Sequence, residues 1–198
     1  MSRHDDPYFK RRLTYHVAGY RLQFDTAALL SSAHEIDPGI DMLLKTLVPM
    51  LSQPPQTVLD LGCNYGNLGL ALAKLFPTAQ VTLMDKDLLA LRYTRLNCVL
   101  NGIENVTVVG GIGVRAAPVG GFDLVVTDLP TKIGDKAIEQ DFVLGPLTLL
   151  RPGGMYWLVS DSQINRLLPG LARKHHLKLT EVVKRHGKTI FTLQKRDL

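Results

Sequence analysis

The chain has 198 residues, of which 45% are hydrophobic and 21% are charged, and its formal net charge is +5. These values are close to globular averages, and they exclude a disordered chain, a small scaffold that needs disulfide bonds to fold, and a protein with a membrane-spanning helix. The two cysteines, Cys63 and Cys98, lie in apolar stretches without metal-like spacing, so we interpret them as reduced core residues of a cytoplasmic protein.

Residues 1–55 are predicted to form an extension rather than an independent domain. The stretch LTYHVAGYRLQF (13–24) alternates on either side of Ala18-Gly19, which is typical of a β-hairpin. The stretch PGIDMLLKTLVPMLSQPP (38–55) predicts an amphipathic helix that Pro54-Pro55 ends. The first residues, MSRHDDPYFKRR, have no apolar run behind their charges, so no signal peptide is expected. We expect the extension to act as a lid over the substrate or cofactor.

Residues 56–198 alternate strands and helices. Five strands are expected at 57–62, 80–85, 105–110, 122–128 and 155–161, and four helices at 66–76, 88–102, 136–150 and 163–175. Residues 177–196 predict two further strands that turn at His186-Gly187-Lys188. The expected fold class is α/β: a Rossmann-like doubly wound sheet, mainly parallel with an antiparallel C-terminal hairpin strand, plus the N-terminal hairpin and helix.

The turn between the first expected strand and helix of this domain carries Asp60, Gly62 and Gly66. A dinucleotide site would need G-x-G-x-x-G, but the spacing here is D-x-G-x-x-x-G, which disfavours an oxidoreductase. A carboxylate at position 60 suits a cationic ligand better than a pyrophosphate. Asp85 ends the next strand, where an acid can bind ribose hydroxyls. The pattern therefore indicates S-adenosylmethionine, whereas the alternative is an ordinary turn with Asp85 as a helix cap.

Four segments resemble the class I methyltransferase fold: VLDLGCNYGNLGLALA, LMDKD, VVTDLP and LLRPGG. Within that fold the chain resembles the "methyltransferase small" family over roughly residues 20–195, including the upstream stretch FDTAALLSSAHEIDPGIDMLL. Members of this family include guanine-N2 methyltransferases of ribosomal RNA. The resemblance implies a methyltransferase that uses S-adenosylmethionine and acts on an amino group in ribosomal or other structured RNA.

The resemblance also implies roles for individual residues. It implies cofactor contacts for Asp60, Gly62, Asn64, Gly66, Asp85, Lys86, Gly111, Ile112 and Asp128. It implies catalytic roles for Asp128, Leu129 and Pro130, with Thr131 contacting the substrate, because these residues occupy the family's Asn-Pro-Pro-aromatic motif. The chain departs from the family in three places. Asn64 replaces a glycine, residues 110–113 lack the acid that usually meets adenine, and Leu129 and Thr131 replace a proline and an aromatic residue.

The Asp128–Thr131 loop has a plausible chemistry for methyl transfer to an amine. The Asp128 carboxylate and the Leu129 carbonyl would accept the two hydrogens of an exocyclic amine and stabilise the charge that develops on its nitrogen. Thr131 cannot stack on a base. Either a neighbour such as Tyr8, Phe9 or Phe24 supplies the stack, or the acceptor is not a nucleobase.

Positive charge is concentrated at the two ends of the chain. The last 38 residues hold nine Lys/Arg against three Asp/Glu, and Lys10, Arg11 and Arg12 form a second cluster. This distribution favours RNA as the partner, with Lys10, Arg11 and Arg12 contacting phosphates, although a solvated surface is the simpler alternative. No residue spacing indicates a metal site, and His175-His176 lie at adjacent helix positions that point apart.

Two other functions stay open at this level. The enzyme could act on a small molecule or a protein side chain instead of RNA. Alternatively, the divergent Asp128–Thr131 loop could belong to a module that binds the cofactor without catalysis. The sequence does not predict the oligomeric state or the target nucleotide.

Overall fold

The computed structural model describes residues 6–118, 120–164 and 166–195. Its centre is a seven-stranded sheet in the order β5-β4-β3-β6-β7-β9-β8. The strands are β3 (Thr57–Leu61), β4 (Gln80–Asp85), β5 (Val106–Gly110), β6 (Phe122–Asp128), β7 (Leu150–Asp161), β8 (Leu177–Arg185) and β9 (Lys188–Lys195). Strands β3 to β7 are parallel, and β9 is antiparallel to both β7 and β8. The predicted doubly wound α/β fold with an antiparallel C-terminal hairpin is therefore confirmed.

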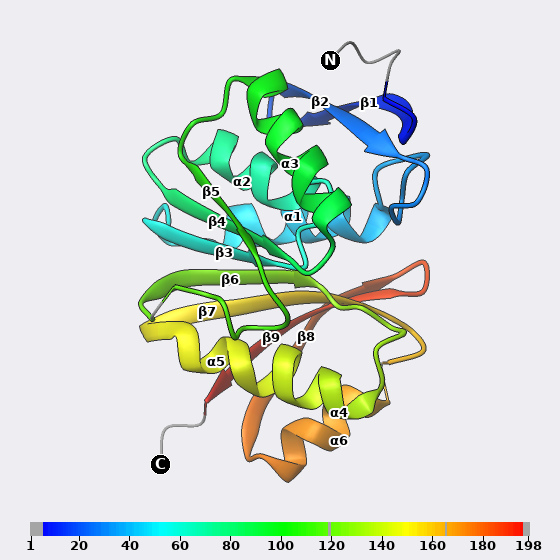
Figure 1. Cartoon of the computed structure of the whole chain (residues 1–198). Coiled ribbons are helices and arrows are strands. Elements are labelled where there is room, and N and C mark those ends of the chain that lie inside the picture. The colour runs from blue at the N-terminus through cyan, green and yellow to red at the C-terminus, as the bar shows by residue number, and fades with distance from the viewer. Residues whose placement is uncertain (1–5, 119, 165, 196–198) are drawn as a thin grey trace.

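Helices cover both faces of this sheet (Figure 1). One face carries α1 (Pro38–Met50), α2 (Asn67–Leu75) and α3 (Leu88–Asn101), and the other carries α4 (Asp135–Ala137), η2 (Ile138–Leu144), α5 (Gly145–Leu149) and α6 (Leu167–Lys174). Because both faces are covered, the central strands β3 and β6 are buried along nearly their whole length. Among the described residues, no helix has both the length and the apolar character needed to cross a membrane.

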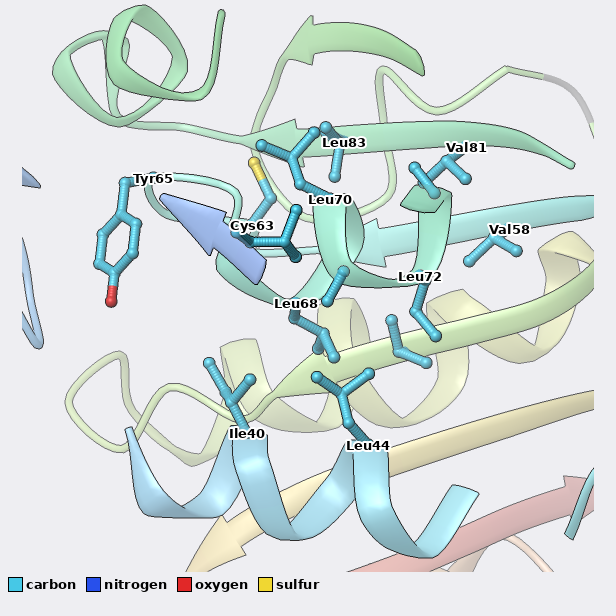
Figure 2. Close-up of a cluster of buried hydrophobic side chains, with 14 of the residues drawn as sticks. Ile40, Leu44, Val58, Cys63, Tyr65, Leu68, Leu70, Leu72, Val81 and Leu83 are labelled. Carbon is cyan, nitrogen blue, oxygen red and sulfur yellow. The ribbon is translucent and has the colours of Figure 1, made fainter. Parts of the chain in front are cut away.

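Helix α1 is fixed in place by its apolar face. Figure 2 shows Ile40 and Leu44, one turn apart on α1, pointing toward Leu68 of α2. These three side chains are 6%, 1% and 2% exposed, and they belong to the larger of two apolar clusters. Asp37 begins the helix, since its carboxylate accepts a hydrogen bond from the Gly39 amide at 2.7 Å. The packing of α1 therefore also fixes the position of Asp37 beside the carboxyl ends of the parallel strands.

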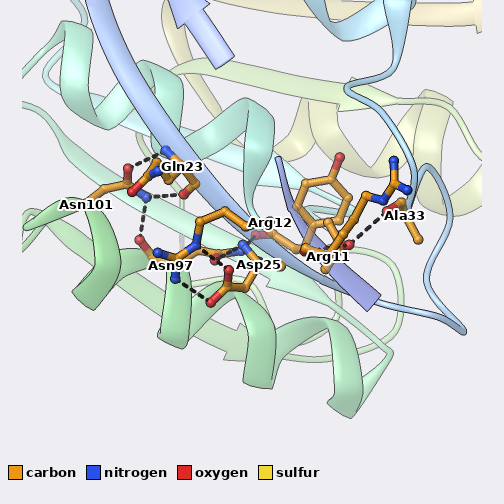
Figure 3. A network of polar contacts seen from close by, with 9 residues as sticks. Arg11, Arg12, Gln23, Asp25, Ala33, Asn97 and Asn101 are labelled. Carbon is orange, nitrogen blue, oxygen red and sulfur yellow. Dashed lines mark hydrogen bonds and ion pairs between the residues drawn. The ribbon is translucent and has the colours of Figure 1, made fainter. Parts of the chain in front are cut away.

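The predicted N-terminal hairpin forms a separate sheet of β1 (Phe9–Val17) and β2 (Tyr20–Ala27). Asn97 and Asn101 lie one turn apart on α3 and bind the free edge of β2, as Figure 3 shows. The amides of Asp25 and Gln23 each donate to one of these side chains at 2.8 Å, and each asparagine donates back to the same residue's carbonyl. These side chains replace a third strand, so the hairpin is docked on the core without extending the main sheet.

Several elements differ from the prediction. Helix α1 ends at Met50, before Pro54-Pro55, and its last turn contains Pro49, which has no amide hydrogen to donate. The single helix expected at 136–150 is instead α4, a π-helical turn η2 and α5 in succession. Strand β7 starts at Leu150 and includes the Pro-Gly-Gly stretch that was expected to precede it.

Candidate active site

A cavity of 760 Å³ lies at the carboxyl ends of the parallel strands, where the strand order reverses between β3 and β6. Ligands of doubly wound sheets bind at such a position. Most of the predicted site residues line this cavity: Asp60, Gly62, Asn64, Asp85, Lys86, Gly111, Ile112, Asp128, Leu129, Pro130 and Thr131. Gly66, Lys10, Arg11 and Arg12 lie outside its described lining. The fold thus gathers the predicted cofactor and catalytic positions around one space, and their individual roles stay predictions.

Asp60 is buried at the end of β3. It is 1% exposed, and its Oδ2 accepts a hydrogen bond from the Gly69 amide at 2.8 Å. A Cβ at position 69 would lie 1.9 Å from the Leu83 side chain, so glycine is needed for α2 to approach the sheet. The pKa of Asp60 is raised to about 8, chiefly by burial and also by the charges of Asp85 and Asp128, while the Gly69 hydrogen bond lowers it. This part of the cavity therefore favours a positively charged ligand.

Asn64 links the glycine loop to two other parts of the cavity wall. It has a φ of 52°, a left-handed conformation that asparagine tolerates well. Its backbone amide donates to Asp85 Oδ2 at 2.8 Å, and its side-chain Nδ2 donates to the Ser31 carbonyl at 2.9 Å. A glycine could not make the second contact. The departure from glycine at this position thus fastens the loop at residues 29–32, which also lines the cavity.

The other predicted cofactor residues supply backbone and apolar surface. The Gly111 amide donates to the Asp85 carbonyl at 2.9 Å, which holds the loop after β5 beside the end of β4. Ile112 is apolar, yet it is 59% exposed and lines the cavity. Its side chain therefore offers an apolar surface against which a flat ring could pack. Lys86 is exposed at the cavity wall. Gly66 has a φ of 90° and forms the left-handed turn that begins α2, behind the lining residues.

The Asp128–Thr131 loop follows β6 and is anchored to the neighbouring strand. The Leu129 amide donates to the Val159 carbonyl of β7 at 2.9 Å. The Leu129 side chain is 3% exposed and packs in the second apolar cluster. Leucine in place of the family's proline therefore adds core packing while the backbone stays at the cavity wall. Thr131 lines the cavity as well, but its side chain offers no ring.

Three charged residues that the sequence did not single out surround Asp128. Lys188 Nζ lies 2.8 Å from Asp161 Oδ1 and 3.3 Å from Asp37 Oδ1, and all three line the cavity. The pKa of Asp128 is raised to about 7, chiefly by burial and also by the charges of Asp37 and Asp161, while Lys188 lowers it. Asp161 ends β7, so the strand-end rule could have identified it. No local signal marks Lys188, because only the antiparallel return of β9 brings it here.

Phe142 is the aromatic residue among the described residues of the lining, and it comes from the π-helical turn η2. Its Cε1 lies 4.0 Å from the point that a Cβ on Gly62 would occupy. The aromatic residues suggested by the sequence do not serve this cavity. Phe24 is fully buried in the core, and neither Tyr8 nor Phe9 lines the cavity. The sequence missed Phe142 because the whole region was expected to be a regular helix that covers the sheet.

The basic residues of β1 lie on the hairpin. Arg12 forms a bidentate ion pair with Asp25, with Nε 2.6 Å from Oδ1 and Nη2 2.8 Å from Oδ2. Arg11 donates to the His34 carbonyl at 3.2 Å, and Lys10 is exposed. Because the guanidinium of Arg12 is engaged within the fold, Lys10 and Arg11 are the better candidates in this cluster for a phosphate contact.

The charge of the cavity follows from its wall. Seven aspartates and three lysines of the described residues line it, so the wall is acidic although the whole chain is basic. An acidic site attracts a cation and repels a pyrophosphate. Among the described residues, no group of three or more His, Cys, Asp and Glu side chains has an arrangement that could hold a metal ion. The acidic wall suits a small cationic cofactor.

Comparisons with known proteins agree with this geometry. The profile of the family described as "Methyltransferase small domain" matches residues 21–191. Ribosomal RNA small subunit methyltransferase C of Pseudomonas entomophila is 35% identical over 130 residues, which are 64% of this chain and 38% of that protein. The protein of the same name from Hahella chejuensis is 34% identical over 152 residues, which are 75% of this chain and 42% of that protein.

A solved structure shows the same fold. It is the 16S rRNA guanine-N2 methyltransferase of T. thermophilus in complex with AdoMet and guanosine, with a TM-score of 0.80 and 25% sequence identity. The similarity covers 96% of this chain and 52% of that one. The chain thus spans about half or less of the length of these relatives.

Proposed function

Because the chain belongs to the methyltransferase small domain family, we propose that it transfers a methyl group from S-adenosylmethionine to an exocyclic amine of guanine-N2 type in ribosomal RNA. The relatives named as ribosomal RNA methyltransferases support the reaction and the substrate class. The observation that carries the proposal is the acidic cavity in which Asp60 and Asp85 converge with Asp128. Ribosomal RNA as the substrate implies a cytoplasmic enzyme.

The residues of the cavity fit S-adenosylmethionine. The cofactor, when bound, supplies a methyl group on a positively charged sulfonium. Asp60, which is buried and whose pKa is about 8, favours a cation beside it, because a positive charge lowers that pKa and stabilises the carboxylate. Both Asp85 oxygens already accept one backbone N–H each, from Asn64 and Asp87, and each keeps a lone pair for a ribose hydroxyl.

The loop at residues 29–32 supports a lid role for the N-terminal extension. It lines the cavity, and Asn64 and Tyr65 bind it through the carbonyls of Ser31 and Ser32 at 2.9 and 3.3 Å. The loop joins the hairpin to α1, so it can cover a bound ligand while both ends stay docked. We therefore assign residues 1–55 the covering role and residues 56–198 the role of binding the cofactor.

Asp128 and the Leu129 carbonyl act on the acceptor amine. An exocyclic amine is a weak nucleophile because its lone pair is delocalised into the ring. Two acceptors on its hydrogens hold the nitrogen toward the methyl group and stabilise its developing positive charge. Phe142 offers the aromatic face that Thr131 lacks, and base stacking on an aromatic side chain contributes about 1–3 kcal/mol.

Exposed basic residues border this end of the sheet and suit an RNA backbone. Lys132 lines the cavity and is exposed. Lys184 and Arg185 are exposed at the turn between β8 and β9, which lies beside the end of β7 because Lys188 pairs with both Asp161 and Arg185. We call these three residues the basic rim. Their positive charges would attract RNA phosphates outside the cavity, while the acidic wall would attract the cationic cofactor inside it.

Methyl transfer to RNA tests this function directly. The purified chain is incubated with methyl-labelled S-adenosylmethionine and unmodified small-subunit ribosomal RNA, and the digested nucleosides are analysed by mass spectrometry. We expect methylguanosine from the wild type and about 10²–10³-fold slower formation by Asp128→Ala. Labelling of protein or small molecules without labelling of RNA would favour the alternative acceptors. Cofactor binding without any transfer would favour a binding module.

A further inference from the structure

The part of the cavity beside the loop after β5 needs a hydrogen-bond acceptor. The adenine ring of S-adenosylmethionine carries an exocyclic amino group, and a buried donor without a partner costs binding free energy. The loop residues Gly110, Gly111, Ile112 and Gly113 have no polar side chain that could accept from it. The acceptor must therefore come from the backbone or from another element.

The π-helical turn η2 brings Asp141 to this place. The turn runs from Ile138 to Leu144, and the Gly145 amide donates to the Gln140 carbonyl, an i to i−5 bond. Such turns are rare in proteins, and those that do occur are often found at functional sites. Asp141 and its neighbour Phe142 both line the cavity, so this turn presents two consecutive side chains to the ligand space.

Close packing fixes Asp141 against the β5 loop. A Cβ on Gly113 would lie 2.4 Å from the Asp141 carboxyl group, so the carboxyl occupies the space that a side chain at position 113 would fill. A Cβ on Gly145 would lie 2.6 Å from the Val114 side chain. The two glycines thus let η2 approach the loop closely enough for Asp141 to stand in for a side chain of the loop.

The Asp141 carboxylate keeps its capacity to accept. Its side chain is 15% exposed, and its charged partner in the described parts of the chain is Arg115, whose Nε lies 4.0 Å from Oδ1. That separation is longer than a hydrogen bond. Asp60 and Asp85, by contrast, already accept hydrogen bonds within the protein. Asp60 accepts one from the Gly69 amide, and Asp85 accepts two from backbone amides.

From this arrangement we propose that Asp141 accepts the hydrogen bond from the adenine amino group of the cofactor, and so selects adenine over a purine with a carbonyl at the same position. The proposal rests on the proposed function, because it assumes S-adenosylmethionine as the ligand. It assigns the adenine contact to a helix on the opposite face of the sheet from α2 and α3. Ile112 and Met84, which also line the cavity, supply apolar surface for the ring.

Calorimetry with two ligands tests this assignment. The first ligand is S-adenosylhomocysteine, and the second is S-inosylhomocysteine, in which a carbonyl oxygen replaces the amino group. The wild type should bind the adenine ligand at least about tenfold more tightly, because the inosine carbonyl would face a carboxylate. Asp141→Ala should lose about tenfold in affinity for the adenine ligand and little for the inosine ligand.

Two further variants separate recognition from structure. Asp141→Asn keeps an acceptor oxygen and should retain affinity for the adenine ligand, but its NH2 group can donate to the inosine carbonyl, so the preference for adenine should shrink. Glu139→Ala is the matched control, because Glu139 lies on the same turn but contacts Lys174 and His175. It should leave both affinities unchanged.

The outcomes distinguish the two proposals. If Asp141→Ala keeps the wild-type preference, or weakens both ligands equally, Asp141 does not recognise adenine and the inference is wrong. If the wild type binds neither ligand, the proposed function itself fails.

Discussion

The two sides of the cavity are built differently. On the side that we assign to the cofactor, Asp60, Asn64 and Asp85 lie within one short stretch of sequence, and backbone amides hold their side chains or loops. On the acceptor side, Asp128 is surrounded by charges from remote segments, with Lys188 joining Asp37 and Asp161. One side is defined by local backbone geometry, and the other by the balance of charges that the tertiary fold brings together.

This difference predicts different sensitivities. A carboxylate held by backbone amides should contribute chiefly to affinity, because its contacts with the ligand exist in the ground state. A carboxylate within a charge network should contribute chiefly to rate and pH dependence, because its ionisation depends on its neighbours. Substitutions on the two sides should therefore separate into effects on binding and effects on turnover.

The largest effect should come from Asp128. We expect Asp128→Ala to lower kcat by about 10²–10³-fold, as removal of a transition-state acceptor does, while the Kd for S-adenosylmethionine changes little. Asp128→Asn keeps an acceptor oxygen and restores the residue of the family motif, so it should keep substantial activity. Steady-state kinetics and calorimetry provide the two measurements. Unchanged methylation of RNA by Asp128→Ala would remove this loop from catalysis.

A smaller effect, on affinity, should come from Asp85. Asp85→Ala should weaken cofactor binding by about 1.5–3 kcal/mol, because it loses charge-assisted hydrogen bonds to ribose. Lys45→Ala is a surface control, since Lys45 pairs with Asp41 on α1. Titration calorimetry measures both variants. Equal affinity of the wild type and Asp85→Ala would contradict the placement of ribose.

Lys188 should set the pH dependence of turnover. In the proposed mechanism Asp128 acts as a carboxylate, and its pKa is raised to about 7, so activity should rise with pH through that value. The charged groups that act on it are Asp37 before α1, Asp161 at the end of β7 and Lys188 at the start of β9. Lys188→Met removes the cation that lowers this pKa, so the profile should move to higher pH, with the largest loss of rate below neutrality.

Two controls accompany this pH experiment. Lys188→Arg keeps the charge and should keep the wild-type profile. In an Asp128→Asn background, which has no carboxylate to titrate at this position, Lys188→Met should cause no shift. If Lys188→Met lowers the rate equally at every pH, Lys188 supports the fold rather than the ionisation of Asp128.

The smallest expected effect concerns the basic rim outside both sides of the cavity. The affinity for RNA should fall with salt, and the double variant Lys184→Ala/Arg185→Ala should reduce the log–log slope by about 0.7–0.9 for each phosphate that the protein no longer neutralises. Arg173→Ala/Lys178→Ala is the matched control, because it removes two exposed charges near the far end of β8. Filter binding at several salt concentrations measures both slopes. If the Lys184→Ala/Arg185→Ala variant and the control show the same salt slope, the turn between β8 and β9 does not contact RNA and its charges serve solubility.

A second pair of variants tests the N-terminal cluster. Lys10→Ala/Arg11→Ala leaves the ion pair of Arg12 with Asp25 intact and avoids a loss of stability that would obscure the result. If this pair binds RNA with the affinity and salt slope of the wild type, the N-terminal cluster is not part of the RNA site. Cofactor affinity should not change in either case.

The sequence predicted the main sheet and the two hairpins well, and it selected aspartates that the fold gathers around one cavity, because these features depend on local patterns. Strand ends identify Asp60, Asp85 and Asp128 directly, and parallel strands place them at one edge. Asp141 and Lys188 could not be predicted in the same way. The position of Asp141 depends on a π-helical turn, and that of Lys188 on the antiparallel pairing of β9 with β7.

A single-turnover methyl transfer at increasing cofactor concentration tests the central claim most directly. Wild type, Asp85→Ala and Asp128→Ala are each mixed with RNA and labelled S-adenosylmethionine, from below the wild-type Kd to far above it. We predict that Asp85→Ala approaches the wild-type rate when the cofactor is saturating, whereas Asp128→Ala stays slow at every concentration. Recovery of Asp128→Ala at high cofactor, or failure of Asp85→Ala to recover, would contradict the division of this cavity into a cofactor side and an acceptor side.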